Sequence, residues 1–174
     1  LYSGDLGYMT AEGLLYVKGR FKSLLISSDG EKYSPEGIEE ALVQLCPTID
    51  QVMLYNNQSP TTSALIVPNK AVLAQMGFDL KSEEGRRAAA NAVNADVAKF
   101  RKGGEFASMF PERWVPSSFI LLKEPFSEQN QMINSTMKMV RGKIEKAYAD
   151  KLEYVYTPEG KRVDNPQNLA ALES

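Results

Sequence analysis

The sequence contains no histidine and a single cysteine, Cys46, among its 174 residues. Without histidine, the chain can build neither a Ser-His-Asp triad nor the common histidine-ligated metal sites. One cysteine cannot form an internal disulfide. Cys46 stands near a predicted helix end, directly before Pro47, and we interpret it as a small buried residue.

Long apolar runs and an excess of one charge are also missing. No hydrophobic stretch approaches membrane-spanning length, and the first residues do not resemble a signal sequence. Twenty Lys and Arg against 22 Asp and Glu leave a net charge of −2, which argues against a protein that follows nucleic-acid phosphates or a membrane-surface helix. We expect a cytoplasmic protein with no integral membrane segment and no nucleic-acid partner, while a peripheral membrane association of a longer parent protein stays open.

What is present suits one folded core. With 43% hydrophobic and 24% charged residues, the chain can bury a core and carry appended segments. Periodicity and turn residues predict, in the first part of the chain, a β-hairpin within 1–22, a buried strand at 24–26, and a helix capped by Ser34 that ends near Cys46. A strand at 49–55, a turn at 56–62, a strand at 63–67 and helices at 70–77 and 82–102 follow. The last predicted elements are a strand at 117–122, a helix from near Thr136 through Leu152, and an exposed tail past Tyr156. The prediction is an α+β fold, a small mixed β-sheet flanked by helices and preceded by a β-hairpin.

The first candidate site is Asp5, which lies in the string Tyr-Ser-Gly-Asp-Leu-Gly at residues 2–7. An ionised carboxylate only accepts hydrogen bonds, so it can bind both hydroxyls of a vicinal diol such as a ribose. Aspartates beside glycine are also common in turns, and a purely structural role for Asp5 stays open.

The second candidate site is a basic turn followed by a glycine turn. Arg20 offers a planar guanidinium for a phosphate or sugar, and Lys22 offers a point charge. After the short apolar run, residues 27–30 are turn formers that end in Gly30, whose backbone another molecule can approach closely. Two solvated charges at a strand edge remain the alternative.

The third candidate site is the polar segment 134–143, which places several cations before a predicted helix. Helix N-termini attract anions, so a lysine there could extend forward to a phosphate. A run of charges is otherwise a solvated face.

Together, the order and spacing of these segments resemble the C-terminal part of the adenylate-forming superfamily, which includes acyl-CoA synthetases, adenylation domains of peptide synthetases and firefly-type luciferases. The string at residues 2–7 resembles that family's Tyr/Ser-Thr-Gly-Asp motif. Residues 19–39 resemble its Gly-Arg-x-Lys/Asp hinge and the Gly-Glu-x-x-x-Pro-x-x-Ile-Glu motif that follows. The strings Gly-Glu-Lys-Tyr-Ser-Pro-Glu-Gly-Ile-Glu and Thr-Met-Lys-Met-Val-Arg look most like the long-chain fatty acid-CoA ligase branch.

The resemblance implies roles for the candidate residues in the first two segments. Asp5 matches the aspartate that holds the ribose hydroxyls of ATP or AMP, and Arg20 matches the arginine that contacts the nucleotide. Lys22 stands at the hinge between the two domains. Gly30 matches the glycine that lines the pantetheine channel for coenzyme A (CoA).

The catalytic lysine of the family falls in the third segment, where two residues compete. Lys138 matches when the preceding Ser-Thr and the following cation are aligned, and Lys143 matches the Gly-Lys-Ile string of many members. We predict Lys138 as the catalytic residue and keep Lys143 as the rival.

The resemblance further implies an ATP-dependent, AMP-forming acyl-CoA synthetase that uses ATP, Mg²⁺ and coenzyme A with a fatty acid. Residues 1–21 then end a large N-terminal adenylation domain, residues 22–156 form the C-terminal lid domain, and residues 157–174 form a tail. The expectation is that the chain is a piece of a longer enzyme, with its own N-terminal domain as partner, and that these 174 residues alone are inactive.

Two other classes of function remain as alternatives. A non-catalytic α+β module that docks a carrier or partner protein explains the long helix at 82–102 equally well. Arg101-Lys102-Gly103-Gly104 also prompts an RNA-binding domain, but the balanced charge makes this a poor fit.

Overall fold

The computed structural model describes residues 5–20 and 23–174. The strands are β1 (Asp5–Met9), β2 (Leu15–Arg20), β3 (Leu25–Ser27), β4 (Lys32–Tyr33), β5 (Ile49–Tyr55), β6 (Asn57–Ser59), β7 (Ser63–Pro68) and β8 (Ser118–Leu121). The helices are α1 (Glu36–Leu45), α2 (Lys70–Gln75), α3 (Glu83–Ala98), the 3₁₀ turn η2 (Glu112–Trp114), α4 (Arg141–Ala147), α5 (Ala149–Tyr154) and α6 (Pro166–Leu172). The predicted α+β class is confirmed. No helix in the described ranges is both long enough and apolar enough to cross a membrane.

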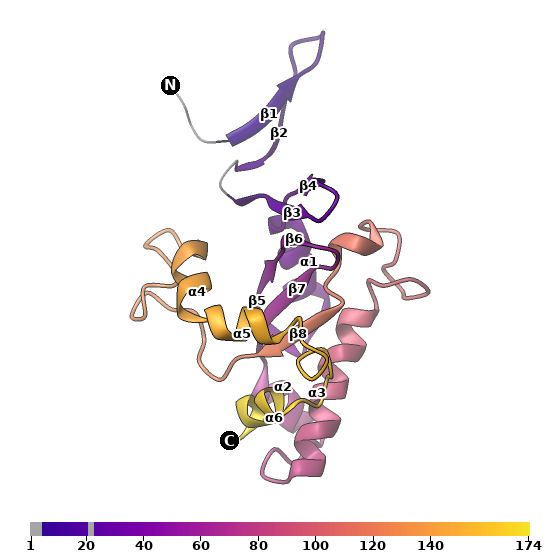
Figure 1. The fold of residues 1–174 in the computed structure, drawn as a ribbon, viewed down its shortest axis with the longest axis vertical. Coiled ribbons are helices and arrows are strands. Elements are labelled where there is room, and N and C mark those ends of the chain that lie inside the picture. The colour runs from indigo at the N-terminus through magenta and orange to yellow at the C-terminus, as the bar shows by residue number, and fades with distance from the viewer. Residues whose placement is uncertain (1–4, 21–22) are drawn as a thin grey trace.

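The N-terminal hairpin stands apart from the rest of the fold in Figure 1. β1 and β2 pair antiparallel, which confirms the predicted hairpin, and Gly13 adopts a φ of +85° in the turn between them. The Tyr8 and Tyr16 rings stack across the strands with centroids 5.3 Å apart. Apolar side chains nevertheless remain exposed, including Met9 at 67% and Leu15 at 64%. A two-stranded ribbon of this kind is only marginally stable alone.

Two three-stranded sheets form the body of the fold. The first has the order β4-β3-β6, and the second has the order β5-β7-β8, in which β7 pairs antiparallel with β5 and parallel with β8. The segment predicted as a turn at 56–62 also contains the short strand β6, which pairs parallel with β3. Its residues Asn57, Gln58 and Ser59 show no apolar alternation, and Gln58 has a φ of +58°. The pattern of a strand is therefore absent from this segment of the sequence.

Helix α1 follows the second glycine-containing turn. The sequence predicts Ser34 as its N-cap, but the helix begins at Glu36 and no side chain caps its first turn. The helical spacing of apolar residues in the sequence predicts that Ile38, Leu42 and Leu45 share one buried face. Ile38 and Leu42 are buried, whereas Leu45 is 37% exposed. The helix instead buries the charged residue Glu39.

Helix α3 lies along the long axis of the molecule in Figure 1. It is shorter than predicted and ends at Ala98. Asp96 in its last turn is buried and accepts hydrogen bonds from Thr48 N at 3.2 Å and Thr48 Oγ1 at 2.6 Å. Cys46 is fully buried nearby, and burial raises the pKa of its thiol to about 12. The thiol is therefore protonated at neutral pH, which agrees with the structural interpretation of Cys46.

The final predicted helix is two shorter ones. The prediction of a helix from near Thr136 is wrong, because residues 134–140 form an irregular loop and α4 begins at Arg141. Tyr148, with φ of −115° and ψ of 25°, separates α4 from α5. Ile144 and Leu152 are buried as predicted, since the apolar spacing continues across the break.

The predicted exposed tail past Tyr156 is also wrong. Residues after 156 turn back and form α6, which packs on α3 and β8, with Leu172 fully buried. The buried Asn168 accepts from Leu121 N at 2.7 Å and donates to Phe119 O at 3.3 Å. Because β8 is an edge strand, this amide satisfies backbone groups that no other strand pairs with.

Replacing Asn168 with leucine should destabilise the chain by about 2 to 4 kcal/mol, because two hydrogen bonds to buried backbone groups and one to a partly buried group are lost. Those partners are Leu121 N, Phe119 O and Val163 O. Urea unfolding followed by circular dichroism measures the change. The same substitution at the neighbouring, partly exposed Gln167 is the control and should cost less than about 1 kcal/mol. Equal midpoints for Asn168→Leu and the unmodified chain would contradict the edge-capping role.

Candidate functional site

Lys138 lies in a tight turn before α4. Asn134 N donates to Lys138 O and Met137 N donates to Asn134 O, both at 2.9 Å. The Asn134 side chain adds to this closure, because its Oδ1 accepts from Thr136 N, Thr136 Oγ1 and Lys138 N at 2.7 to 3.0 Å. Lys138 is exposed. The residue therefore stands on an ordered turn and not at a helix N-terminus, which corrects the dipole argument made from the sequence.

The base of this turn is held by the backbone. Ile133 and Met139 form an antiparallel bridge, and Val140 N donates to Met132 O at 2.8 Å. The two ends of the turn are thus joined independently of the side chains at its tip.

A buried ion pair fixes the turn to the body of the fold. Arg141 donates to both carboxylate oxygens of Glu39, at 2.6 Å for Oε1, and their side chains are only 13% and 7% exposed. Glu39 Oε1 also accepts from Leu54 N at 2.7 Å, while Arg141 Nη1 donates to Leu54 O at 3.2 Å. Burial raises the pKa of the Glu39 carboxyl, and Arg141 and the Leu54 amide oppose that rise.

A cleft of about 670 Å³ lies between α1, β5 and this turn. Its lining includes Ser23, Glu36, Glu40, Asp50, Met137 and Lys138. Ser23, which directly follows the predicted hinge residue, and Lys138 are far apart in the sequence, yet the fold brings them to one cleft. Most of the charged groups around Lys138 in this cleft are carboxylates.

The rival lysine has a different environment. Lys143 lies in α4, is exposed, and its Nζ donates to Gln131 Oε1 at 2.7 Å. It is not among the residues that line the cleft. The two lysines thus differ in position, and the cleft is associated with Lys138.

Gly30 lies in a turn of its own, between β3 and β4. Its φ is +83°, and a Cβ built there would have no heavy atom within 4 Å. Asp29 Oδ1 accepts from Ser27 Oγ and from Glu31 N, the latter at 3.1 Å. Arg113 holds the turn from outside through Glu31, with Nε and Nη2 at 2.6 and 2.7 Å from its two oxygens. The glycine is therefore presented to solvent on a braced turn.

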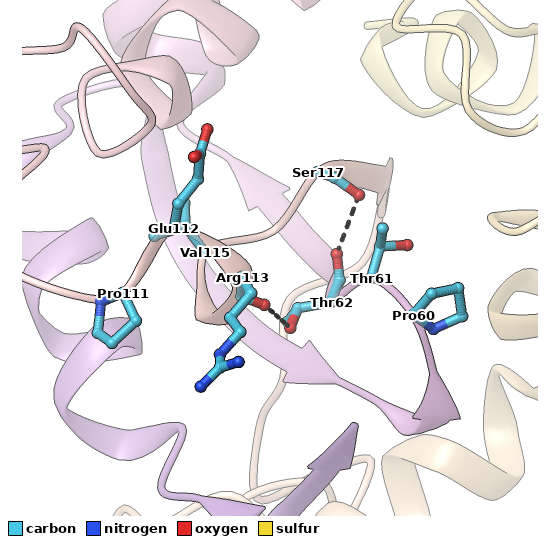
Figure 2. A pocket seen from close by; sticks show the side chains of 8 residues that line it. All are labelled: Pro60, Thr61, Thr62, Pro111, Glu112, Arg113, Val115 and Ser117. Carbon is cyan, nitrogen blue, oxygen red and sulfur yellow. Dashed lines mark hydrogen bonds between the residues drawn. The ribbon is translucent and has the colours of Figure 1, made fainter. Parts of the chain in front are cut away.

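A second hollow, of about 570 Å³, lies beside the same arginine (Figure 2). It is lined by Pro60, Thr61, Thr62, Pro111, Glu112, Arg113, Val115 and Ser117. Thr62 Oγ1 donates to Arg113 O at 2.9 Å, and Figure 2 shows the guanidinium directed away from Ser117. Of the predicted residues whose side chains the structure describes, Asp5, Gly30 and Lys138 do not line this hollow.

The predicted nucleotide-binding residues lie on the hairpin. Asp5 begins β1 and is register partner of Arg20, which ends β2, so the backbones of the two residues are neighbours. Lys22 lies outside the described residues. Asp5 is exposed and does not line either hollow described above.

Three residues that organise these turns are absent from the sequence-based prediction of the site. Glu39 carried a usable signal, because it is a charge beside Ile38 on the apolar face of a helix, and a buried charge requires a partner. Arg141 and Arg113 carried none, since each contacts a carboxylate more than 80 positions away in the sequence.

Metal ligands are not gathered at either turn. In residues 5–20 and 23–174 no three or more His, Cys, Asp or Glu side chains form a group that could hold a metal ion. The residues present therefore do not fit a protein-held Mg²⁺ site, and no chemical step is assigned to one.

Comparison with protein families gives one match that covers most of the chain. The family model described as AMP-binding enzyme C-terminal domain matches residues 22–160. This range contains both turns and the Glu39–Arg141 pair, and it leaves out the hairpin and α6.

Curated proteins similar to the chain include fatty acid ligases. Long-chain-fatty-acid–CoA ligase ACSBG2 of Gallus gallus is 26% identical over 180 residues, which cover 90% of this chain and 23% of that protein. Long-chain-fatty-acid–CoA ligase ACSBG1 of Homo sapiens is 41% identical over 66 residues, 38% of this chain and 9% of that protein. The chain spans about a quarter of the length of the curated relatives that it matches over most of its own length.

Solved structures with the same fold come from carboxylic acid reductases. The A-PCP didomain from Segniliparus rugosus in complex with AMP is 24% identical with a TM-score of 0.67, covering 89% of this chain and 20% of that one. The adenylation domain of the carboxylate reductase from Mycobacterium chelonae is 21% identical with a TM-score of 0.69, covering 88% and 22%. At these identities the likeness shows a shared fold.

Replacing Arg141 with alanine should destabilise the chain by about 3 to 5 kcal/mol at pH 7, because it leaves the Glu39 carboxylate buried without its partner. Protonation of Glu39 relieves that penalty. Loss of Arg141 raises the folded-state pKa of Glu39 further above its unfolded value, so the deficit should shrink as the pH falls from about 7 toward 4. Urea unfolding at several pH values measures it.

The matched control is Arg113→Ala, which removes an equally two-pronged contact with a glutamate. In that pair Arg113 is 58% exposed and the half-buried Glu31 is 27% exposed, so its loss should cost about 1 kcal/mol or less at any pH. A deficit for Arg141→Ala that is as small as the control, or that grows in acid, would contradict the buried-pair interpretation.

Proposed function

The chain belongs to the AMP-binding enzyme C-terminal domain family, and we propose that it is the C-terminal lid domain of an AMP-forming long-chain fatty acid-CoA ligase. In this proposal the complete enzyme converts a fatty acid, ATP and coenzyme A into acyl-CoA, AMP and diphosphate. The likeness to ACSBG ligases supports the substrate class. The present chain supplies a catalytic lysine and the hinge, and it is inactive without the rest of the enzyme.

The observation that carries the proposal is the shared cleft of Ser23 and Lys138. A lysine that acts on a substrate held by another domain must be exposed, held by an ordered backbone, and on the face of the lid where the chain enters from that domain. Lys138 is exposed on a turn that five hydrogen bonds close and that the buried Arg141 anchors. Ser23, beside the proposed hinge Lys22, lines the same cleft.

In the first half-reaction a carboxylate oxygen of the fatty acid attacks the α-phosphorus of ATP. The new bond joins that carboxylate oxygen to the α-phosphorus, and the bond that breaks joins the α-phosphorus to the bridging oxygen that leaves with diphosphate. Negative charge grows on the phosphate oxygens, and a pre-positioned ammonium group stabilises it. Lys138 has this role, while Asp5 holds the ribose hydroxyls and Arg20 contacts the nucleotide. Mg²⁺ would enter as part of the ATP substrate and would neutralise phosphate charge, with no described residue assigned to hold it.

In the second half-reaction the thiol sulfur of coenzyme A attacks the acyl carbon, and AMP leaves with the bonding electrons of the C–O bond. Lys138 has to leave the site and a channel for pantetheine has to form. A rigid-body turn of residues 23–174 about Lys22 achieves both. Gly30 then faces the channel, and its lack of a side chain and its left-handed φ suit a close approach of the thiol arm.

The apolar hairpin supports a large N-terminal partner domain. Tyr8, Met9, Leu15 and Val17 are 50 to 67% exposed on a ribbon that cannot bury them itself. Coverage by the preceding part of a longer chain removes this surface from water. Asp5 and Arg20 then lie at the junction of the two domains.

Lys138→Ala in the complete enzyme should lower fatty acid-dependent ATP–diphosphate exchange by about 10² to 10³-fold, because one charge-stabilising donor is lost. Thiolysis of supplied acyl-adenylate by coenzyme A should change less than about twofold, since that step does not use the lysine. Lys143→Ala is the control and should keep both activities. A larger exchange defect for Lys143→Ala than for Lys138→Ala would reverse the assignment of the lysine.

Gly30→Leu should impair the thioester step and spare the exchange reaction, because its side chain enters the proposed pantetheine channel. Separate assays of ATP–diphosphate exchange and acyl-CoA formation distinguish the two. Gly103→Leu is the matched control, because Gly103 has the same φ of +83° and open surroundings but lies far along the chain, after α3. Equal losses of both half-reactions in Gly30→Leu would argue for simple backbone strain and against a channel.

A further inference from the structure

The Lys138 turn depends on one side chain at its tip. Asn134 Oδ1 accepts three hydrogen bonds, from Thr136 N at 3.0 Å, Thr136 Oγ1 at 2.7 Å and Lys138 N at 3.0 Å. The last of these bonds joins the amide oxygen directly to the backbone of the lysine. Asn134 is itself exposed, so it contributes little packing.

The backbone of the tip also needs this support. Met137, the residue before Lys138, has a φ of +61° and is 74% exposed. A non-glycine residue in the left-handed region is strained by about 1 kcal/mol or more, and such a conformation persists only when its surroundings enforce it. No packing enforces it here, because the Met137 side chain is mostly in solvent. The left-handed conformation is instead enforced by the hydrogen bonds that Thr136 and Lys138, on either side of Met137, donate to Asn134 Oδ1.

The base of the turn does not depend on Asn134. The Ile133–Met139 bridge and the bond from Val140 N to Met132 O join the flanking segments. Removing the Asn134 amide should therefore release the tip and leave the domain folded.

We propose that Asn134 is a positioning residue that orients the Lys138 ammonium through the backbone of the turn. This inference rests on the proposed function of Lys138. The Asn134 side chain accepts from Lys138 N and stabilises the left-handed Met137, so the direction in which the Lys138 side chain leaves the turn is set before substrate binds. The Asn134 side chain itself touches no substrate.

The test uses three variants. Asn134→Ala removes the acceptor, and Asn134→Asp keeps it, because all three hydrogen bonds are donated to the side-chain oxygen. Asn130→Ala is the matched control, because Asn130 Oδ1 likewise accepts from two backbone amides, Ser127 N and Met132 N at 3.0 and 3.2 Å, in the neighbouring loop.

Two measurements are made on these variants. Amide hydrogen exchange on the 174-residue chain reports the Lys138 N–H, which should exchange about tenfold faster in Asn134→Ala and near the original rate in the other two variants. In the complete enzyme, kcat for ATP–diphosphate exchange should fall about 10 to 100-fold in Asn134→Ala, because a displacement near 1 Å at a catalytic group costs on that order. The KM for ATP and the rate of acyl-adenylate thiolysis should stay within about twofold.

Two further variants complete the set, Lys138→Ala and the double variant that combines Asn134→Ala with Lys138→Ala. If the amide acts through the lysine, Asn134→Ala should add no further loss to Lys138→Ala. If ATP–diphosphate exchange is normal in Asn134→Ala but slow in Lys138→Ala, the positioning role is overturned and the proposed function stays intact. Normal kinetics in Lys138→Ala would overturn both. The positioning role would also be overturned if Asn134→Ala lowered the rate of acyl-adenylate thiolysis as much as it lowered ATP–diphosphate exchange. Losses of ATP–diphosphate exchange that add in the double variant would overturn it as well.

Discussion

The Glu39–Arg141 pair is the interaction on which the arrangement of the site depends. The carboxylate accepts the Leu54 N–H, and the guanidinium donates to the Leu54 carbonyl, so two charged side chains satisfy both outward groups of one edge-strand residue. Their charges are buried and compensate each other. The pair thereby joins α1, β5 and α4 at one point, and α4 follows the Lys138 turn directly.

The opposite edge of the same sheet is closed in a comparable way. Asn168 bonds to the outward backbone groups of β8, and α6 covers that strand. An unpaired strand edge is a place where another chain can add. Side chains that mimic a missing strand remove that hazard without a fourth strand. They also make the positions of the helices that carry them depend on hydrogen bonds to the strand backbone as well as on apolar packing.

The proposed chemistry lies on turns outside this scaffold. Gly30 and Lys138 are both exposed, and each lies on a turn closed by the oxygen of an Asp or Asn side chain, Asp29 in one case and Asn134 in the other. Both turns take left-handed backbone conformations, at Gly30 and at Met137. In the proposed function both groups act on a ligand outside the domain, and the apolar hairpin likewise presents a surface that the described chain does not cover itself. The family assignment, the exposed turns and the uncovered hairpin are all consistent with a lid that works against a second domain.

The sequence by itself determined the features that depend on local pattern or on motif order. Those features are the α+β class, the hairpin, β5 with its partner β7, α2, the glycine turn and the family. Propensity, turn chemistry and apolar spacing act between neighbours along the chain, so they can be read without a fold. Tertiary structure alone decided the rest. It buried Glu39 and left Leu45 exposed, began helix α4 at Arg141 instead of near Thr136, and folded the predicted tail onto β8. Each of these outcomes is set by a partner distant in the sequence, such as Arg141 for Glu39 or the Leu121 amide for Asn168, and the free energy of a buried polar group depends on whether that partner is present.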